Sequence, residues 1–234
     1  MHEHFRLLAV AAGVLLTAAC YDSDPADPTR DVRGLSLDVL ADSAPADGAT
    51  TVRLVVQVPS SARGDARTAS FTTTLGTLLG ADAGVLKATA NGADTVVAEL
   101  RAPETSGWAR IRSTVSGVIL EDSVRFTPAW PTNIDVDPGK FALSTGFTNE
   151  LNVKATLRRA VGKVTAGMMV TFTAVRADTG EPIGQHSVPA PSDATGVVTV
   201  RFSAGATDYR GPVVITATHA QSSVSGSAHV QIVD

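Results

Sequence analysis

Residues 108–126 decide the fold class of this chain: Trp108-Ala109-Arg110-Ile111-Arg112-Ser113-Thr114-Val115-Ser116-Gly117-Val118-Ile119-Leu120-Glu121-Asp122-Ser123-Val124-Arg125-Phe126. Apolar and polar side chains alternate along this stretch, and a period of two predicts strands that bury one face. Because Gly117 tolerates the positive φ that opens a type II′ turn, we expect a hairpin with Gly117 and Val118 as its turn residues. The pairs that this turn predicts place every apolar partner on one face: Val115 with Leu120, Ile111 with Val124, and Ala109 with Phe126.

The same alternation recurs along the chain from Gly34 onward. Short runs rich in Val and Thr are separated about every ten residues by Gly, Pro, Asn or Asp, which is typical of a β-sandwich. One strand is predicted to bury Leu54, Val56 and Val58, and another to bury Val96, Ala98 and Leu100. Sustained helical periodicity is missing after the N-terminal segment, so we predict an all-β fold.

The second half of the chain repeats the first. The apolar positions of residues 151–157, 170–174, 198–202 and 228–232 echo those of strands about 100 residues earlier. That period suits two tandem immunoglobulin-like β-sandwiches of roughly 100 residues each. We place them at residues 34–128 and 132–234, with a linker at 129–131 that two flanking prolines stiffen and in which Trp130 is expected to form a wedge between the domains.

Several motifs resemble the bacterial immunoglobulin-like repeats of invasin and intimin type, the Big-1-like domains. The first domain carries Ser70–Leu78 (SFTTTLGTL), Thr89–Gly92 (TANG) and Val96–Leu100 (VVAEL). The second offers Val170–Phe172 (VTF), Asp193–Gly196 (DATG) and Val198–Val200 (VTV). The resemblance implies a sandwich that serves as a rigid spacer or adhesive module, and it implies no particular ligand.

The N-terminal segment carries the only cysteine, Cys20. Residues 1–19 combine Arg6 with about ten apolar residues, the length of a secretion-signal core and too short for a spanning helix. The residues Ala18-Ala19-Cys20 resemble the lipobox of bacterial lipoproteins, which implies cleavage before Cys20, acylation of its thiol by chains such as palmitate, and a membrane anchor. The alternative is a free thiol inside an ordinary cleaved signal.

Residues 20–33 follow as a tether with four aspartates and two prolines, a composition that favours a solvated spacer. Because Tyr21 follows the cysteine where some inner-membrane lipoproteins have Asp, the resemblance implies an exported protein in the outer membrane, facing the periplasm or the surface.

Composition and motifs narrow the function classes. The formal net charge of −4 and an aromatic content of 5% give no reason to expect nucleic acid as a partner. Motifs for a nucleophile elbow, a zinc protease or a phosphate loop are missing, so we expect no catalytic residue, no cofactor and no metal. His219 and His229 could suggest a metal pair, but the parity of their strands sends them to opposite faces, and we expect surface histidines.

Two groups of residues are candidates for partner contacts. Arg63-Gly64-Asp65 resembles the integrin-binding tripeptide of adhesion proteins if it lies on an exposed hairpin, although a solvated turn favours the same residue types. Trp108 shares the outward parity of Arg110 and Arg112; this group is either a partner contact or a structural one, with Trp108 covering the core end and stacking on Arg110. Tyr209 is expected to form a tyrosine corner.

These features together predict a lipid-anchored envelope protein whose non-catalytic sandwiches act as an adhesive or structural module. Its expected partners are the membrane and another envelope or surface protein, and the oligomeric state is left open. Two alternatives are an accessory lipoprotein that captures carbohydrate or substrate, and an enzyme with a site borne on loops.

Overall fold

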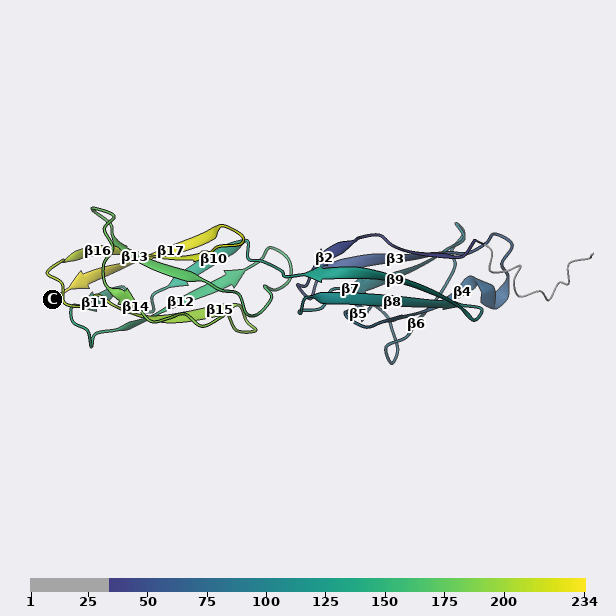
Figure 1. The fold of residues 1–234 in the computed structure, drawn as a ribbon, viewed down its shortest axis with the longest axis horizontal. Coiled ribbons are helices and arrows are strands. Elements are labelled where there is room, and N and C mark those ends of the chain that lie inside the picture. The colour runs from purple at the N-terminus through teal and green to yellow at the C-terminus, as the bar shows by residue number, and fades with distance from the viewer. Residues whose placement is uncertain (1–33) are drawn as a thin grey trace, which may run out of the picture.

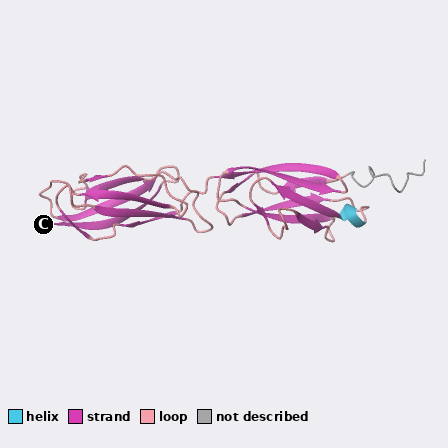
Figure 2. Ribbon diagram, turned by 90° about the horizontal axis from the view of Figure 1, so that it is seen from below, coloured by secondary structure: helices cyan, strands magenta, loops and turns pink. Residues whose placement is uncertain are grey.

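The computed structural model describes residues 34–234, which form two β-sandwiches placed end to end (Figure 1). Strands make up nearly all of the regular structure, and a single turn of 3-10 helix, η1 (Gly64–Arg67), is the helical element of this part of the chain (Figure 2). The all-β prediction is therefore confirmed. The expected signal, Cys20 and tether lie outside the described residues.

The first sandwich packs a four-stranded sheet against a five-stranded sheet. The smaller has the order β1-β3-β7-β5, and the larger has the order β2-β9-β8-β4-β6. Their strands are β1 (Ser36–Val39), β2 (Ser43–Pro45), β3 (Thr51–Gln57), β4 (Thr68–Thr73), β5 (Thr77–Leu78), β6 (Leu86–Thr89), β7 (Thr95–Arg101), β8 (Gly107–Val115) and β9 (Val118–Thr127).

The core of the first sandwich consists of the residues that the period of two assigns to it. Leu54, Val56 and Leu100 are fully buried between the sheets together with Phe71 and Phe126. Each such side chain contributes about 1.5–3 kcal/mol when it is removed from water, so these alternating positions supply much of the stability of a domain that has no disulfide.

The second sandwich repeats this plan with two four-stranded sheets. Their orders are β10-β12-β15-β14 and β11-β17-β16-β13. The strands are β10 (Asn133–Asp137), β11 (Ala142–Ser144), β12 (Leu151–Arg158), β13 (Thr171–Arg176), β14 (Gln185–His186), β15 (Val197–Ser203), β16 (Gly211–His219) and β17 (Val224–Val233). A separate core encloses the predicted positions Val153, Phe172, Val200 and Ile232.

The β8–β9 hairpin has a different register from the predicted one. Val115 pairs with Val118 and Ala109 with Val124, so the turn residues are Ser116 and Gly117. Both have positive φ, +46° and +81°, as a type I′ turn requires. The predicted turn was wrong by one position, but the pairing slips by two residues, so every side chain keeps its predicted face.

One short strand in each sandwich pairs in parallel with the last strand. β2 lies beside the end of β9, and β11 lies beside the end of β17. The remaining pairs are antiparallel. Because β9 ends toward the second sandwich and β17 ends at the far tip, both parallel pairs run along the long axis of the molecule (Figure 1).

Candidate functional site

The outer face of the five-stranded sheet presents the predicted Trp108 group. Trp108, Arg110 and Arg112 are all exposed, as their parity indicates, and Trp108 exposes 63% of its surface. The register places Arg125 directly opposite Trp108. The structural alternative for Trp108 is wrong, because an indole this exposed does not cover the core, and the cation–π contact of residues 34–234 joins other residues.

That cation–π contact lies in the second sandwich, where the guanidinium of Arg176 sits 4.4 Å from the ring centre of Tyr209. The hydroxyl of Tyr209 donates to the carbonyl oxygen of Pro212 at 2.9 Å. Tyr209 is thus structural, as predicted, and ties the loop before β16 to the start of that strand; its bond runs three residues downstream, whereas the hydroxyl of a tyrosine corner bonds upstream. A Cβ at Gly211 would lie 2.5 Å from the Tyr209 hydroxyl oxygen, so a larger residue would displace the Tyr209 ring.

Arg63-Gly64-Asp65 is exposed, but it does not form the expected hairpin. Gly64 and Asp65 begin η1 between β3 and β4, and the guanidinium of Arg63 donates to the carbonyl oxygens of Ser60 and Ala62 at 2.8 Å each. Since Gln57 at the end of β3 pairs with Ser36, this turn lies at the end of the first sandwich where the described chain begins (Figure 2).

The histidines of the β16–β17 hairpin lie on opposite faces, as predicted. His229 is exposed, whereas His219 is 1% exposed, so the expected surface position of His219 is wrong. The Nδ1 atom of His219 lies 2.8 Å from the Ser222 hydroxyl and accepts the Ser222 N–H at 3.3 Å. Burial lowers the pKa of His219, and the accepted N–H also favours a neutral imidazole.

A hydrogen-bonded joint connects the two sandwiches through Asp47, which is 1% exposed in the loop between β2 and β3. Its carboxylate accepts the N–H groups of Ala49 (2.9 Å) and Thr50 (2.7 Å) and the Thr50 hydroxyl (2.7 Å), and lies 3.8 Å from the guanidinium of Arg159 in the second sandwich. Burial alone would raise the pKa of Asp47, but these donors and the Arg159 charge hold it below its usual value.

The main chain of Asp47 completes this contact. Its carbonyl oxygen accepts the N–H of Lys163 at 2.8 Å. Gly162, with φ of +68°, approaches so closely that a Cβ would lie 2.5 Å from the same oxygen. On the side chain of Lys163, the ammonium reaches Glu104 of the first sandwich at 2.7 Å, although both groups are exposed. The close approach of this loop to Asp47 therefore depends on Gly162, which has no side chain.

The linker itself is held by Thr165. The Thr165 hydroxyl accepts the N–H of Ala129 at 2.8 Å and donates to the carbonyl oxygen of Ala46 at 3.2 Å, while its own N–H donates to the Ala129 carbonyl oxygen at 3.1 Å. Ala129 is fully buried, whereas Trp130 is 43% exposed. Trp130 is thus not the expected wedge; the buried residue of the linker is Ala129.

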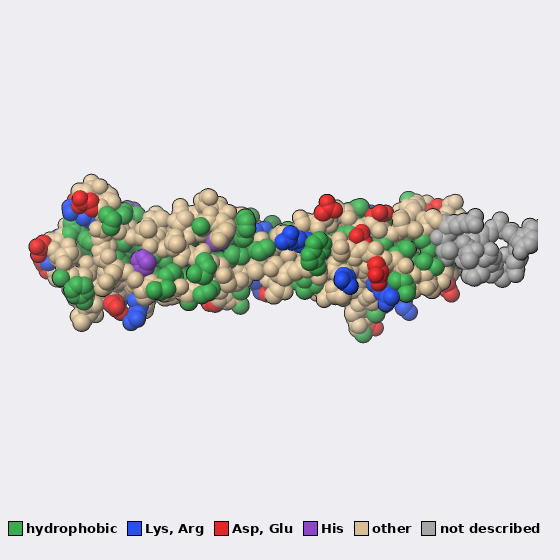
Figure 3. Space-filling view, viewed as in Figure 1, with side chains coloured by type: hydrophobic (Ala, Val, Ile, Leu, Met, Phe, Trp, Pro, Cys, Tyr) green, Lys and Arg blue, Asp and Glu red, His purple; other side chains and the backbone are tan. Residues whose placement is uncertain are grey.

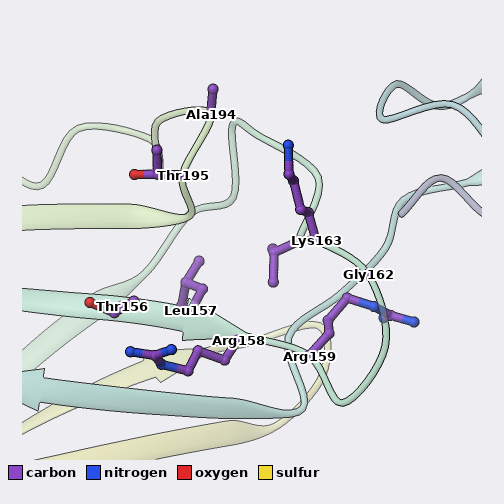
Figure 4. A pocket seen from close by; sticks show the side chains of 9 residues that line it. Thr156, Leu157, Arg158, Arg159, Gly162, Lys163, Ala194 and Thr195 are labelled. Carbon is purple, nitrogen blue, oxygen red and sulfur yellow. The ribbon is translucent and has the colours of Figure 1, made fainter. Parts of the chain in front are cut away.

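A hollow of about 360 Å³ opens beside the joint (Figure 4). Three cationic side chains line it, and they point in different directions. Each is already engaged: Arg158 with Asp135, Arg159 with the Trp130 carbonyl oxygen at 2.6 Å, and Lys163 with Glu104. The hollow therefore offers no unpaired charge to a ligand, and we assign it to the joint.

No helix within residues 34–234 has the length and apolar character needed to cross a membrane. No cluster of three or more His, Cys, Asp or Glu side chains in the same range could hold a metal ion.

Comparisons with known proteins support the fold. No family model matches the chain, and no curated protein matches its sequence. The chain is similar to the solved structure of invasin, a bacterial integrin-binding protein, with a TM-score of 0.60 and 16% identity over 85% of this chain and 39% of that one. It is also similar to the adhesin InvE of Yersinia pseudotuberculosis, with a TM-score of 0.49 and 21% identity over 85% of this chain and 60% of that one.

The chain thus spans less than two thirds of the length of both proteins. At 16% identity the likeness to invasin shows the fold alone, which is a tandem of immunoglobulin-like β-sandwiches.

Proposed function

We propose that this chain is an exported lipoprotein, anchored through acyl chains on Cys20, whose sandwiches act as a non-catalytic adhesive or structural module at the bacterial envelope. The residue pattern around Cys20 supports the anchor. The observation that supports the module most is the braced joint, in which the buried Asp47 and the close approach of Gly162 fix one sandwich on the other. Such a joint suits a spacer that holds a surface away from its attachment point.

The placement of Arg63-Gly64-Asp65 argues against a role in adhesion. This turn lies at the end of the first sandwich where the chain enters. An anchor at Cys20 would hold that end toward the membrane, whereas the exposed sheet faces and the far tip would be free. We therefore assign partner contacts to the sheet faces, and expect Asp65→Glu to leave cell attachment unchanged.

Fractionation of cells tests the anchor. The wild-type chain is expected in the membrane fraction, released by detergent and not by high salt, and the outer-membrane proposal predicts that it sediments with that membrane. Cys20→Ala should yield a folded protein in the soluble fraction, because two or three acyl chains are needed for stable attachment. Retention of the variant in the membrane fraction would refute the anchor.

Co-purification from native membranes, with mass spectrometry of the recovered proteins, tests the module. We expect at least one envelope or surface protein to be recovered with the wild-type chain. A matched preparation of the Cys20→Ala protein, added back to detergent extracts, should recover the same partner, since the contact lies in the sandwiches. Recovery of no partner in either preparation would contradict the proposal.

A further inference from the structure

The outer face of the five-stranded sheet in the first sandwich collects positive charge. Cross-strand register places Arg125 beside Trp108 on neighbouring strands, Arg110 beside Ser123 in the next row, and Arg112 beside Glu121 in the row after that. Lys87 on β6 lies across from Ser70 at the far edge of the same sheet. Figure 3 shows Lys and Arg side chains over β8 and β9, with acidic side chains beside them on the same half of the molecule.

The positive charge of this face contrasts with the net charge of the first sandwich. Residues 34–128 hold eight basic and ten acidic residues, so the first sandwich has a net charge of −2. Its two outer faces nevertheless differ. The face of the five-stranded sheet carries four cations and one acid, Glu121, whereas the strands of the opposite sheet pair two cations, Arg53 and Arg101, with two acids, Asp38 and Glu99.

The cations on this face are largely unengaged. Arg112 lies 3.4 Å from Glu121, an exposed pair that contributes little. Within residues 34–234 the guanidinium groups of Arg110 and Arg125 make no ion pair or hydrogen bond. They flank the exposed indole of Trp108, so a planar aromatic surface and two free forked donors lie side by side.

The shape of the face points to an extended ligand. The best-formed hollows of residues 34–234 lie at the joint or in the second sandwich, and their linings include no residue of this face. The hot spots of protein interfaces cluster in well-packed pockets, so this flat and charged face favours an extended ligand over a protein, whose contacts would lie on the other exposed faces. A flat lattice of guanidinium and hydroxyl groups, repeating about every 6.7 Å along β8, suits a chain of repeated acidic and hydroxylated units instead. The hydroxyls come from Ser43, Thr72, Thr114 and Ser123.

We infer that this face binds an acidic polysaccharide, with Arg110 and Arg125 bonding its carboxylate or sulfate groups and Trp108 packing against a sugar ring. The inference goes beyond the proposed function, because it concerns a glycan ligand and holds whether or not the chain is anchored or recovers a protein partner. Its test uses purified protein in vitro, so its failure is distinguishable from failure of the fractionation experiment.

Heparin, a sulfated and uronate-bearing polysaccharide, is the probe. We expect the full chain in detergent to bind immobilised heparin, to release it as salt rises, and to ignore neutral dextran. Arg110→Gln with Arg125→Gln should weaken the apparent affinity roughly fivefold or more. The matched control is Arg53→Gln with Arg101→Gln, which removes the same charge from the opposite face and should leave the affinity within about twofold.

Trp108 provides an independent readout. In a Trp130→Phe background, the fluorescence of Trp108 should shift as soluble heparin is added, and Trp108→Ala should weaken binding further. Equal loss in the two double variants would mean that net charge alone drives binding, and would overturn the inference. So would absence of heparin binding, or tighter binding of polyglutamate than of heparin at matched charge, which would identify an acidic protein as the partner.

Discussion

Gly162→Ala should loosen the joint between the sandwiches. The new Cβ would lie 2.5 Å from the Asp47 carbonyl oxygen and 2.7 Å from the Asp47 Cγ, so the loop has to withdraw. A φ of +68° costs an alanine about 1–2 kcal/mol, and loss of the hydrogen bond from Lys163 costs about 0.5–1.5 kcal/mol more. We expect the free energy of unfolding to fall by about 2–3 kcal/mol.

Gly167→Ala is the matched control in the same loop. Gly167 has a φ of +85°, but a Cβ there would meet nothing within 4 Å. It should therefore carry the conformational cost of about 1–2 kcal/mol without disturbing the joint.

Small-angle X-ray scattering measures the difference between these two variants. The control should keep the extended profile of the wild type, whereas Gly162→Ala should show a broader distribution of pair distances and a shorter mean dimension. Scattering curves that superimpose for wild type and Gly162→Ala would refute the argument that this contact fixes the domains.

Two further predictions concern buried polar groups. Within residues 34–234 the hydroxyl of Ser113 is buried without a hydrogen-bond partner, which costs free energy in the folded state. Ser113→Ala should therefore raise the free energy of unfolding of the first sandwich by about 1 kcal/mol, and a lower melting temperature would contradict this. Burial lowers the folded-state pKa of His219 below 6.5, so the unfolded chain binds more protons than the folded chain as the pH falls below that value. The free energy of unfolding of the second sandwich should therefore be full above about pH 6.5 and should decrease below it. Denaturant titrations at pH 7.5 and 5.5 should show this loss in wild type and in His229→Gln but not in His219→Gln.

The strand faces could be predicted from the sequence because burial follows residue parity. Leu54 and Val56 alternate with polar or less buried neighbours, and the same rule orders Ala109 and Ile111. The parity of Val213, Ile215 and Ala217 also places His219 inside, although a histidine is commonly expected at the surface.

Registers and the joint could not be predicted in this way. Gly117 fits either turn position, and only the positive φ of Ser116 distinguishes the two turns. The slip of two residues decides that Arg125 faces Trp108; the predicted register would have placed it opposite Arg110. Asp47 and Gly162 are far apart in the sequence, and no local pattern indicates that they meet.

The parallel pairs β2–β9 and β11–β17 bear on how the molecule would respond to mechanical load. If the two chain ends are pulled apart, β2 is drawn one way along the axis and β9 the other, and the same holds for β11 and β17. The backbone hydrogen bonds between the strands, such as that from Ala46 to Thr127, are then strained together in shear. An antiparallel hairpin pulled from its open end would instead lose its bonds one at a time, so each sandwich is built to resist stretching along its length.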